Sequence, residues 1–428
     1  MNLWIKNGHV LDPANHLDEV CDVYVKEGKV ACVGSLSSDK IPDECTVIDA
    51  EGKYVMPGLV DLHVHLREPG FEYKETIYSG THAMAKGGFT AVCPMPNTKP
   101  VTDSPAMIEK ILKIAKTDSP IHVYPVGAVT KGQQGEEMAD IAGMVKAGAK
   151  AISEDGKSVM NAEIYREAMK EAKKAGIPVL AHCEDKNMVG HGAMNAGKKA
   201  KELGICGITN AVEDVIVARD ILLAKETGVH LHLCHCSTKD SVKMVRIAKK
   251  DGVSVSAEVC PHHFAMTEDE IAGDDANYKM NPPLRSAADV EALVDGLADG
   301  TMEAISTDHA PHGEEEKKQS IAKAPFGIVG SETAYALSVT HLVKTGKLTP
   351  LQLVEKMSTN PCRILSVPGG TLSVGEPADI TIADMDSEYV IDKNTFLSKG
   401  KNTPFDGAKV NGRVYYTIVG GNIVYQYE

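Results

Sequence analysis

Residues 59–70 read LVDLHVHLREPG, and the rest of the chain is organised around this segment. It starts as an apolar run, which predicts a buried strand, and it carries two histidines one residue apart. Side chains at i and i+2 of a strand point to the same side, so His63 and His65 can be aimed at one point in space. Two such imidazoles predict half of a metal site. An isolated pair would equally fit two satisfied core histidines, so the prediction depends on the remaining sequence.

The composition is that of a globular protein. The chain has 428 residues, of which 43% are hydrophobic and 24% are charged. This length suffices for one large domain with a small one, or for two or three domains. The formal net charge of −14 argues against nucleic acid or an anionic membrane as the main partner.

The ten cysteines are scattered, without a C-x-x-C pair, which fits free thiols in a reducing compartment. The N-terminal residues lack the apolar core of a signal peptide, and no apolar run approaches the length of a membrane span. We therefore expect a cytoplasmic protein that binds neither nucleic acid nor membranes.

Short apolar strands alternate with helical segments from residue 59 onward. Helical patterns cover 105–116, 161–175, 214–227, 238–251 and 287–297, with Gly176 just past the end of one of them. This order predicts a parallel sheet, and eight β-α units over about 250 residues match a (β/α)8 TIM barrel. The eight predicted strands are 59–65, 89–94, 121–127, 149–153, 178–182, 229–235, 253–258 and 303–307.

Both ends of the chain have β patterns. Residues 3–10 predict a strand, a turn and a second strand, and Glu27-Gly28 predicts a hairpin turn. Residues 378–383 and 414–419 predict strands, and 420–422 a turn into the last one. We therefore predict an α/β protein with a small β-sandwich-like domain built from residues 1–56 and 366–428, and a barrel domain over residues 57–365.

Polar residues cluster where the predicted barrel strands end. Catalytic groups of such barrels lie at the C-terminal ends of the strands, so these residues are expected on one rim. Four histidines and two carboxylates exceed the needs of one tetrahedral zinc and fit two ions roughly 3.5–4 Å apart, bridged by a carboxylate and a hydroxide. This arrangement predicts hydrolysis or cyclisation at an amide. The residues are His63, His65, Asp155, His182, His235 and Asp308.

The ordered set of motifs resembles the dihydroorotases of the bacterial long-chain type, which are cyclic amidohydrolases of the amidohydrolase superfamily. The resemblance covers essentially the whole chain. It rests on DLHVHLREPG at 61–70, MPNT at 95–98, AHCE at 181–184, CHCST at 234–238, EVCPHH at 258–263, MNPPLR at 280–285 and TDHAPH at 307–312.

The resemblance implies two zinc ions per subunit. His63 and His65 would hold one ion together with Asp308, and His182 and His235 would hold the other. Asp155 would bridge the ions, with Glu154 as the competing carboxylate. Many members of the superfamily bridge through a modified lysine instead, for which Lys150 is the candidate here.

The resemblance also implies reversible cyclisation of N-carbamoyl-L-aspartate to L-dihydroorotate, a step of de novo pyrimidine (UMP) biosynthesis. Asp308 would be the general acid/base acting on a metal-bridging hydroxide. Arg67, two residues past a predicted ligand, can clamp a substrate carboxylate in a bidentate way. The implied substrate-binding residues are His65, Arg67, Asn97, Asn281, His312, Phe326 and Gly327.

Two other readings stay open. One is a hydantoinase, dihydropyrimidinase or allantoinase, although an uncharged substrate gives no reason for an arginine at position 67. The other is an inactive dihydroorotase-like scaffold. We further expect a homodimer, and association with another pyrimidine-pathway enzyme stays open. Residues 313–318, GEEEKK, predict a solvated loop, with a role as a lid over the site as the alternative.

Overall fold

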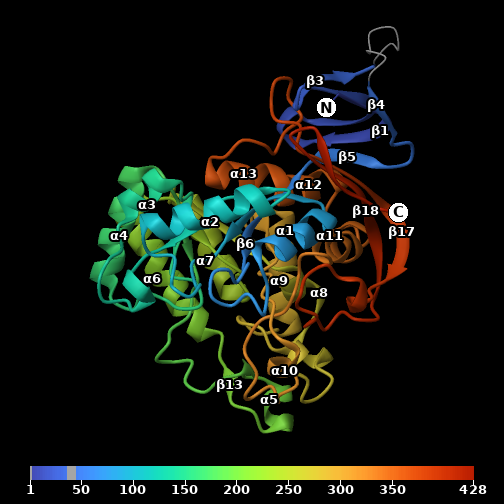
Figure 1. The fold of residues 1–428 in the computed structure, drawn as a ribbon. Helices are drawn as coiled ribbons and strands as arrows, with labels where there is room; N and C mark the ends of the chain where they lie inside the picture. The colour runs from blue at the N-terminus through green and yellow to red at the C-terminus, as the bar shows by residue number, and fades with distance from the viewer. Residues whose placement is uncertain (1, 36–44) are drawn as a thin grey trace.

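A computed structural model describes residues 2–35 and 45–428 of the chain. The central element is a barrel of parallel strands surrounded by helices (Figure 1). All eight predicted strands are present. They are β6 (Leu59–Val64), β7 (Phe89–Pro94), β8 and β9 (His122–Val123 and Val126–Ala128, which share one position), β10 (Ala151–Ser153), β11 (Val179–Ala181), β14 (Leu231–Leu233), β15 (Val255–Val259) and β16 (Ala304–Ile305).

The strands form two parallel ladders that the main chain joins into a closed ring. One ladder has the order β6-β7-β8 and the other β9-β10-β11-β14-β15-β16. At the seam between the first and last strands, the His65 N–H donates to the His309 carbonyl over 2.8 Å. The buried Asp61 carboxylate accepts hydrogen bonds from the His63 and Thr307 N–H groups on either side of that seam. Closure of the ring brings all C-terminal strand ends to one rim.

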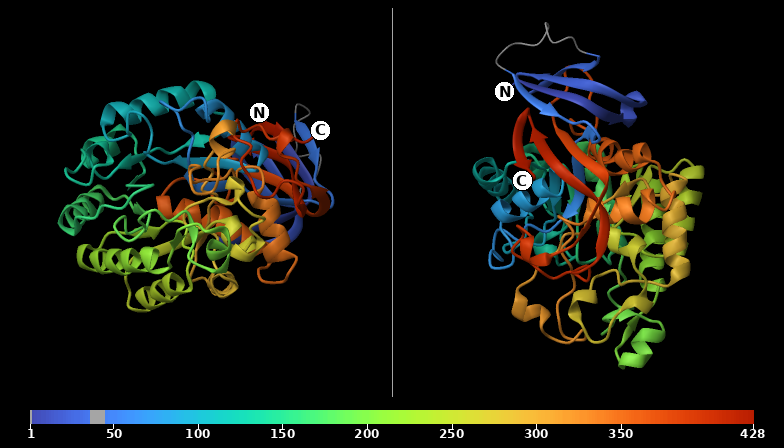
Figure 2. Two further views of the ribbon diagram at one scale, coloured as in Figure 1. Left: turned by 90° about the horizontal axis from the view of Figure 1, so that it is seen from below. Right: turned by 90° about the vertical axis from the view of Figure 1, so that its right-hand side faces the viewer.

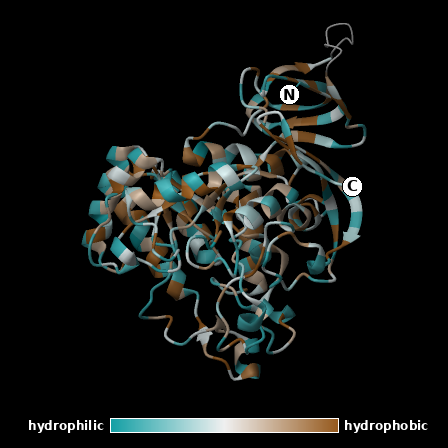
Figure 3. Cartoon of the chain, in the orientation of Figure 1, coloured by the Kyte–Doolittle hydropathy of each residue, from teal (hydrophilic) through white to brown (hydrophobic). Residues whose placement is uncertain are grey.

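Helices surround the strands, and the longer helices show both hydrophobic and hydrophilic segments (Figure 3). The predicted helices are all present, with ends within a few residues of the expected ones. The helices are α1 (Ile77–Lys86), α2 (Pro105–Asp118), α3 (Ile141–Ala147), α4 (Ala162–Ala175), α5 (Lys198–Leu203), α6 (Ala211–Thr227), α7 (Lys239–Lys250), α8 (Pro261–Ala265), α9 (Ala287–Ala298), α10 (Glu314–Lys317), α11 (Ala334–Ser338), α12 (Pro350–Val354) and α13 (Asn360–Leu365).

Local chemistry explains the ends of α4. The Asn161 side chain accepts hydrogen bonds from the Glu163 and Ile164 N–H groups, which satisfies two of the free donors of the first turn. Gly176 follows the last turn with φ of 72°, a left-handed conformation that glycine adopts without steric cost. Between these caps, Tyr165 and Met169 face the core, so helix and barrel share one hydrophobic cluster.

The strands of both termini pair into one eight-stranded sheet, as the views of Figure 2 show. The antiparallel pairing of β5 with β17 joins the N-terminal to the C-terminal strands. Whether this sheet forms a sandwich-like domain with the predicted boundaries stays a prediction. The strands are β1 (Leu3–Asp12), β2 (Leu17–Lys26), β3 (Lys29–Gly34), β4 (Thr46–Asp49), β5 (Tyr54–Pro57), β17 (Ile380–Val390), β18 (Lys409–Val419) and β19 (Asn422–Gln426). A further short pair, β12 (Met194–Asn195) and β13 (Gly207–Ile208), lies outside both sheets.

The prediction of a turn within residues 3–10 was wrong. β1 continues through this segment, and its pairing with β2 shifts register between Ile5 and Gly8. Asn7 lies in this irregularity with φ of 58°. Asparagine tolerates this conformation, so the strand accommodates a bulge where the sequence suggested a reversal.

The C-terminal segment also reaches the barrel rim. The Asn402 side chain accepts a hydrogen bond from the His312 N–H and donates to the Ala310 and Gly327 carbonyls. The Ser398 hydroxyl bonds to the buried Glu75 carboxylate. Within the described ranges, no helix is long and apolar enough to cross a membrane.

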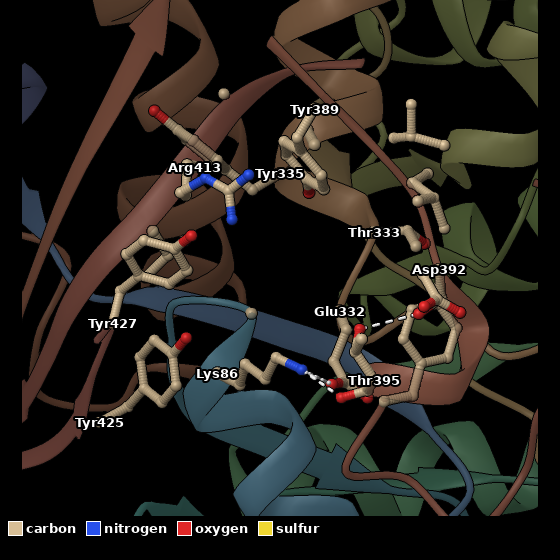
Figure 4. Close-up of a pocket in the computed structure, with 17 residues that line it drawn as sticks. Lys86, Glu332, Thr333, Tyr335, Tyr389, Asp392, Thr395, Arg413, Tyr425 and Tyr427 are labelled. Carbon is tan, nitrogen blue, oxygen red and sulfur yellow. Dashed lines mark hydrogen bonds and ion pairs between the residues drawn. The ribbon is translucent and has the colours of Figure 1, made fainter. Parts of the chain in front are cut away.

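A cavity of about 310 Å³ lies between the terminal sheet and helices α1 and α11 (Figure 4). The Arg413 guanidinium projects into it, 4.2 Å from the ring centroid of Tyr389 and 4.6 Å from that of Tyr427. Lys86 pairs with Glu332 on the opposite side. None of the predicted metal or substrate residues lines this cavity, so the predicted chemistry belongs to another part of the molecule.

Candidate metal centre and active site

The six predicted metal residues meet at the C-terminal rim of the barrel, and each is nearly inaccessible to solvent. His63 Nε2 lies 3.1 Å from Asp155 Oδ1 and 3.6 Å from Asp308 Oδ1. His65 Nε2 lies 3.1 Å from the same Asp308 oxygen. His182 Nδ1 lies 3.0 Å from His235 Nε2 and 3.6 Å from Asp155 Oδ1. Asp155 therefore stands between the two histidine pairs.

Three residues at this rim adopt left-handed backbone conformations although none is glycine. Arg67 has φ of 60°, His235 of 34° and Asp308 of 47°. Such conformations cost of order 1–3 kcal/mol each and concentrate at functional sites. Here they occur where a strand has ended and the chain turns along the rim, next to the side chains that converge.

The donor set fits divalent metal ions. The buried His63 Nε2, His182 Nε2 and His235 Nδ1 atoms have no hydrogen-bond partner among the described residues. Ligand atoms of His63, His65 and Asp308 lie within 4.8 Å of one another, as do those of His63, Asp155 and His235. Both groups combine the imidazole and carboxylate donors that a divalent ion of the zinc type prefers.

Electrostatics prepare the same groups for metal binding. Burial lowers the pKa of His65 and of His182, so both imidazoles are neutral at neutral pH. Burial acts against the charged form of His63 as well, but the nearby Asp155 carboxylate holds its pKa well above the ordinary value. Asp155 keeps its own pKa well below normal, because the histidines around it outweigh its burial. A metal ion would therefore displace a proton from His63 on binding.

The structure separates the two carboxylates that compete for the central position. Both Glu154 oxygens accept hydrogen bonds from Thr130, one from its N–H and one from its hydroxyl. Glu154 thus connects two loops, and Asp155 faces the histidines. Lys150 precedes β10 and lies at the opposite, N-terminal end of that strand, half-buried and far along the strand from this rim.

Asn97 contacts predicted metal residues at both ends of its amide. Its Oδ1 lies 2.9 Å from His65 Nδ1, and its Nδ2 donates to Asp155 Oδ2 over 3.0 Å. If the His65 proton is on Nδ1, its Nε2 atom carries a lone pair that can bind a metal ion shared with Asp308. Asn97, which the resemblance assigns to substrate, therefore also fixes the orientation of two predicted ligands.

Arg67 and His312 lie side by side at the edge of the cluster. Arg67 Nε donates to the Pro311 carbonyl, and a terminal nitrogen lies 3.4 Å from His312 Nε2. His312 Nε2 donates to the Phe326 carbonyl over 2.7 Å, so its proton is on Nε2, and Nδ1 accepts from Lys74 over 3.1 Å. Arg67 thus lies beside His312 as a cation that suits an anionic ligand, whereas Lys74 is paired with Glu316 over 2.9 Å.

Asn281 and the loop with Phe326 and Gly327 approach the same rim. The Asn281 amide donates to Glu184, which follows β11, so its orientation is set by the protein. Gly327 has φ of 129°, and a Cβ there would lie 2.6 Å from the Ala310 Cβ, which excludes any larger residue. The Phe326 carbonyl contacts His312 Nε2 over 2.7 Å, which ties this loop to the residues around Arg67.

Glu258 lies at the site, although the sequence patterns did not predict a role for it. It is the penultimate residue of β15, is fully buried, and lies with one oxygen 3.4 Å from His63 Nδ1. The same carboxylate accepts from the His235 N–H, from His232 Nε2 and from the Ser306 hydroxyl. His232 thus holds Glu258 behind two predicted ligands, His63 and His235. The spacing signal was present, since Glu258 ends a predicted barrel strand as the histidines do.

We predict that Glu258→Gln lowers zinc affinity about tenfold to a hundredfold, since the carboxylate orients a ligand and raises its basicity. Metal content measured after dialysis against graded chelator checks this. Glu213→Gln is the matched control, because Glu213 is also buried but bonds to Ser237 and Ser241 instead of a predicted ligand. Equal zinc retention in both variants would contradict the assigned role.

Known proteins resemble this chain over its whole length. The "Dihydro-orotase-like" family profile matches residues 52–241. The chain is 51% identical to a protein named dihydroorotase from Pelotomaculum thermopropionicum, over 100% of this chain and 99% of that one. It is 49% identical to a protein of the same name from Staphylococcus aureus, over 99% of both.

Solved structures of related enzymes share the fold. An L-hydantoinase (dihydropyrimidinase) from Arthrobacter aurescens matches with a TM-score of 0.88 and 28% identity, over 99% of this chain and 96% of that one. A dihydropyrimidinase from Brevibacillus agri, 23% identical, matches with a TM-score of 0.86 over 100% and 95% of the two chains, which shows likeness of fold alone. From its full-length identity to these relatives, the chain belongs to the dihydroorotase family, with the TIM-barrel fold of the amidohydrolases.

Proposed function

We propose that this protein is a dihydroorotase that interconverts N-carbamoyl-L-aspartate and L-dihydroorotate with two zinc ions per subunit. The observation that carries the proposal is the meeting of four histidines and two aspartates beside one arginine at the barrel rim. Full-length identity of about half to proteins named dihydroorotase supports the substrate. A scaffold would have no use for an ionised aspartate among metal ligands.

His63, His65 and Asp308 would hold one ion, His182 and His235 the other, and Asp155 would bridge them. Bound ions of this kind activate water at neutral pH and polarise the amide carbonyl. Asn97 and Glu258 keep the imidazoles oriented for this task. The bridging role of Asp155, rather than of Glu154 or a modified Lys150, is supported by its position between the histidine pairs.

Asp308 would act as the general acid/base. Its pKa is lowered because the neighbouring His63 and His65 outweigh its burial, so it is ionised and able to accept a proton. In ring opening it would take a proton from the attacking water and return it to the departing ring nitrogen. In ring closure the same carboxylate would move the proton in the opposite direction.

His65, Arg67, Asn97, His312 and Phe326 would line the site of the substrate carboxylate. Arg67 would supply the charged N–H donors, because both ring nitrogens of His65 and of His312 already contact other groups. Asn281 would contact the ring amide, and the turn at Gly327 would bring the loop close. A hydantoinase or dihydropyrimidinase remains the alternative, because solved structures of those enzymes share the fold. The cations at this rim favour an acidic substrate over their neutral ones.

A substrate panel tests the function. Ring opening is measured with dihydroorotate, hydantoin, dihydrouracil and allantoin, and zinc is determined on the same sample. We expect dihydroorotate to give the largest kcat/KM, with about two zinc ions per chain. A larger kcat/KM for an uncharged ring would indicate a hydantoinase or dihydropyrimidinase instead. Absence of both bound metal and turnover would indicate an inactive scaffold.

Arg67→Met should raise the KM for dihydroorotate about tenfold or more, since a hydrogen bond to a charged group contributes about 1.5–3 kcal/mol. Zinc content should stay unchanged. Steady-state kinetics and metal analysis check both points. Arg246→Met serves as the control, because Arg246 pairs with Asp299 on the surface. Unchanged kinetics in the Arg67 variant would contradict the proposal that Arg67 binds the substrate carboxylate.

Asp155→Asn should reduce bound zinc below two ions per chain and abolish turnover, since a neutral amide is a poor bridging ligand. Glu154→Gln should retain zinc and activity but lower stability, because one of its two hydrogen bonds to Thr130 loses its acceptor. Metal analysis, kinetics and urea unfolding of both variants separate these roles. Loss of zinc in the Glu154 variant alone would reverse the assignment.

The remaining proposals concern the whole protein. We propose a cytoplasmic location, which the ten free cysteines support because a reducing compartment keeps thiols free. We also propose that the protein is a homodimer. The catalytic barrel would span residues 57–365, with the β domain of residues 1–56 and 366–428 beside it. Association with another pyrimidine-pathway enzyme is a further proposal that size measurements on mixed proteins would test.

A further inference from the structure

Lys317 is a buried amine for which the proposed chemistry has no use. It belongs to the segment 313–318, which the sequence predicted as a solvated loop, but this residue is only 8% exposed. The neighbouring Lys318 is exposed and pairs with Glu314 and Glu315, as expected of a surface helix. The prediction of a solvated segment was therefore wrong for Lys317, and its burial requires an explanation.

The ammonium of Lys317 donates to three main-chain carbonyls. Nζ lies 3.2 Å from the Lys279 oxygen, 3.1 Å from that of Pro325 and 2.9 Å from that of Gly327. An ammonium has three N–H donors, so the three acceptors use all of them. Burial lowers the pKa of Lys317 to about 7, which indicates that retaining the charge here costs free energy. The Lys317 side chain therefore joins the segment at Lys279 to the loop of residues 325–327.

These segments carry the proposed substrate residues. Lys279 lies two positions before Asn281, and Pro325 and Gly327 flank Phe326. The Gly327 N–H also donates to the Lys279 carbonyl over 3.0 Å, so the two segments meet directly as well. The Lys279 ammonium lies 4.4 Å from the centroid of the Phe326 ring.

The chain of contacts continues to the proposed carboxylate site. The Phe326 carbonyl accepts from His312 Nε2 over 2.7 Å, and His312 lies beside Arg67. A shift of the 325–327 loop would therefore move the carbonyl acceptor that fixes the His312 ring. Small displacements of binding groups reduce affinity because the ligand must then pay for ordering them.

We propose that Lys317 is a positioning residue, whose ammonium holds the 325–327 loop against the Lys279–Asn281 segment so that Phe326, Asn281 and His312 are preorganised for the anionic substrate. The inference rests on the proposed function for the identity of that substrate. It assigns Lys317 no contact with the reacting atoms. Its effect should appear in substrate binding more than in the chemical step.

Lys317→Met keeps the length and apolar stem of the side chain and removes the three donors. We expect the KM for dihydroorotate to rise about tenfold, with kcat reduced less than about threefold and zinc content unchanged, since the hydrogen bonds that hold the loop are lost and those of the metal ligands are kept. Lys318→Met is the matched control and should retain wild-type kinetics.

Hydrogen exchange gives a readout that needs no substrate. Amides of residues 325–328 should exchange faster in Lys317→Met than in wild type, whereas those of β6 should be unchanged. Unchanged KM together with unchanged loop exchange would overturn the proposal. A loss of about tenfold in kcat without a change in KM would overturn it as well. If the methionine variant does not fold, Lys317→Gln, which keeps one amide donor group, replaces it with the same expected direction.

The two proposals fail in different ways. If the wild-type protein does not open dihydroorotate, the proposed function is wrong, but faster loop exchange in the variant would still support the positioning role. If wild type opens dihydroorotate and both Lys317 variants match it in KM and loop exchange, the proposed function stands and the role of Lys317 is removed.

Discussion

Closure of the barrel between β6 and β16 is the constraint on which the site depends. Asp61 accepts hydrogen bonds from the main chain on both sides of this seam, and His65 donates across it to His309. The residues that flank these bonds are His63, near the end of β6, and Asp308, three residues after β16, which are far apart in the sequence. Without the seam they would have no reason to lie 3.6 Å apart.

Burial of so many ionisable groups is sustained by pairing. The chain as a whole is strongly acidic, with a net charge of −14, yet the rim combines two aspartates with four imidazoles and is edged by Arg67 and Lys74. Each buried carboxylate has cationic or N–H neighbours, since unpaired charge would cost several kcal/mol. Local charge, and not net charge, therefore decides what the site attracts.

Periodicity was sufficient to predict the barrel. All eight barrel strands and the five assigned helices follow from apolar runs that alternate with amphipathic segments. The two differences between the predicted and the observed strands have local causes. One predicted strand is split into β8 and β9 around Pro125, which cannot donate to a ladder. Asn7 tolerates a left-handed conformation, so β1 bends there without ending.

The sequence by itself determined which residue types end the barrel strands, because strand order and side-chain alternation are local properties. It thereby indicated the six residues that meet at the rim. Only the tertiary structure decided that Asp155 faces the histidines while Glu154 faces Thr130, that Glu258 lies behind His63, and that Lys317 is buried beside the 325–327 loop. Hydrogen-bond partners and burial depend on segments that are distant in the chain, and no local pattern records which of two adjacent side chains will find them.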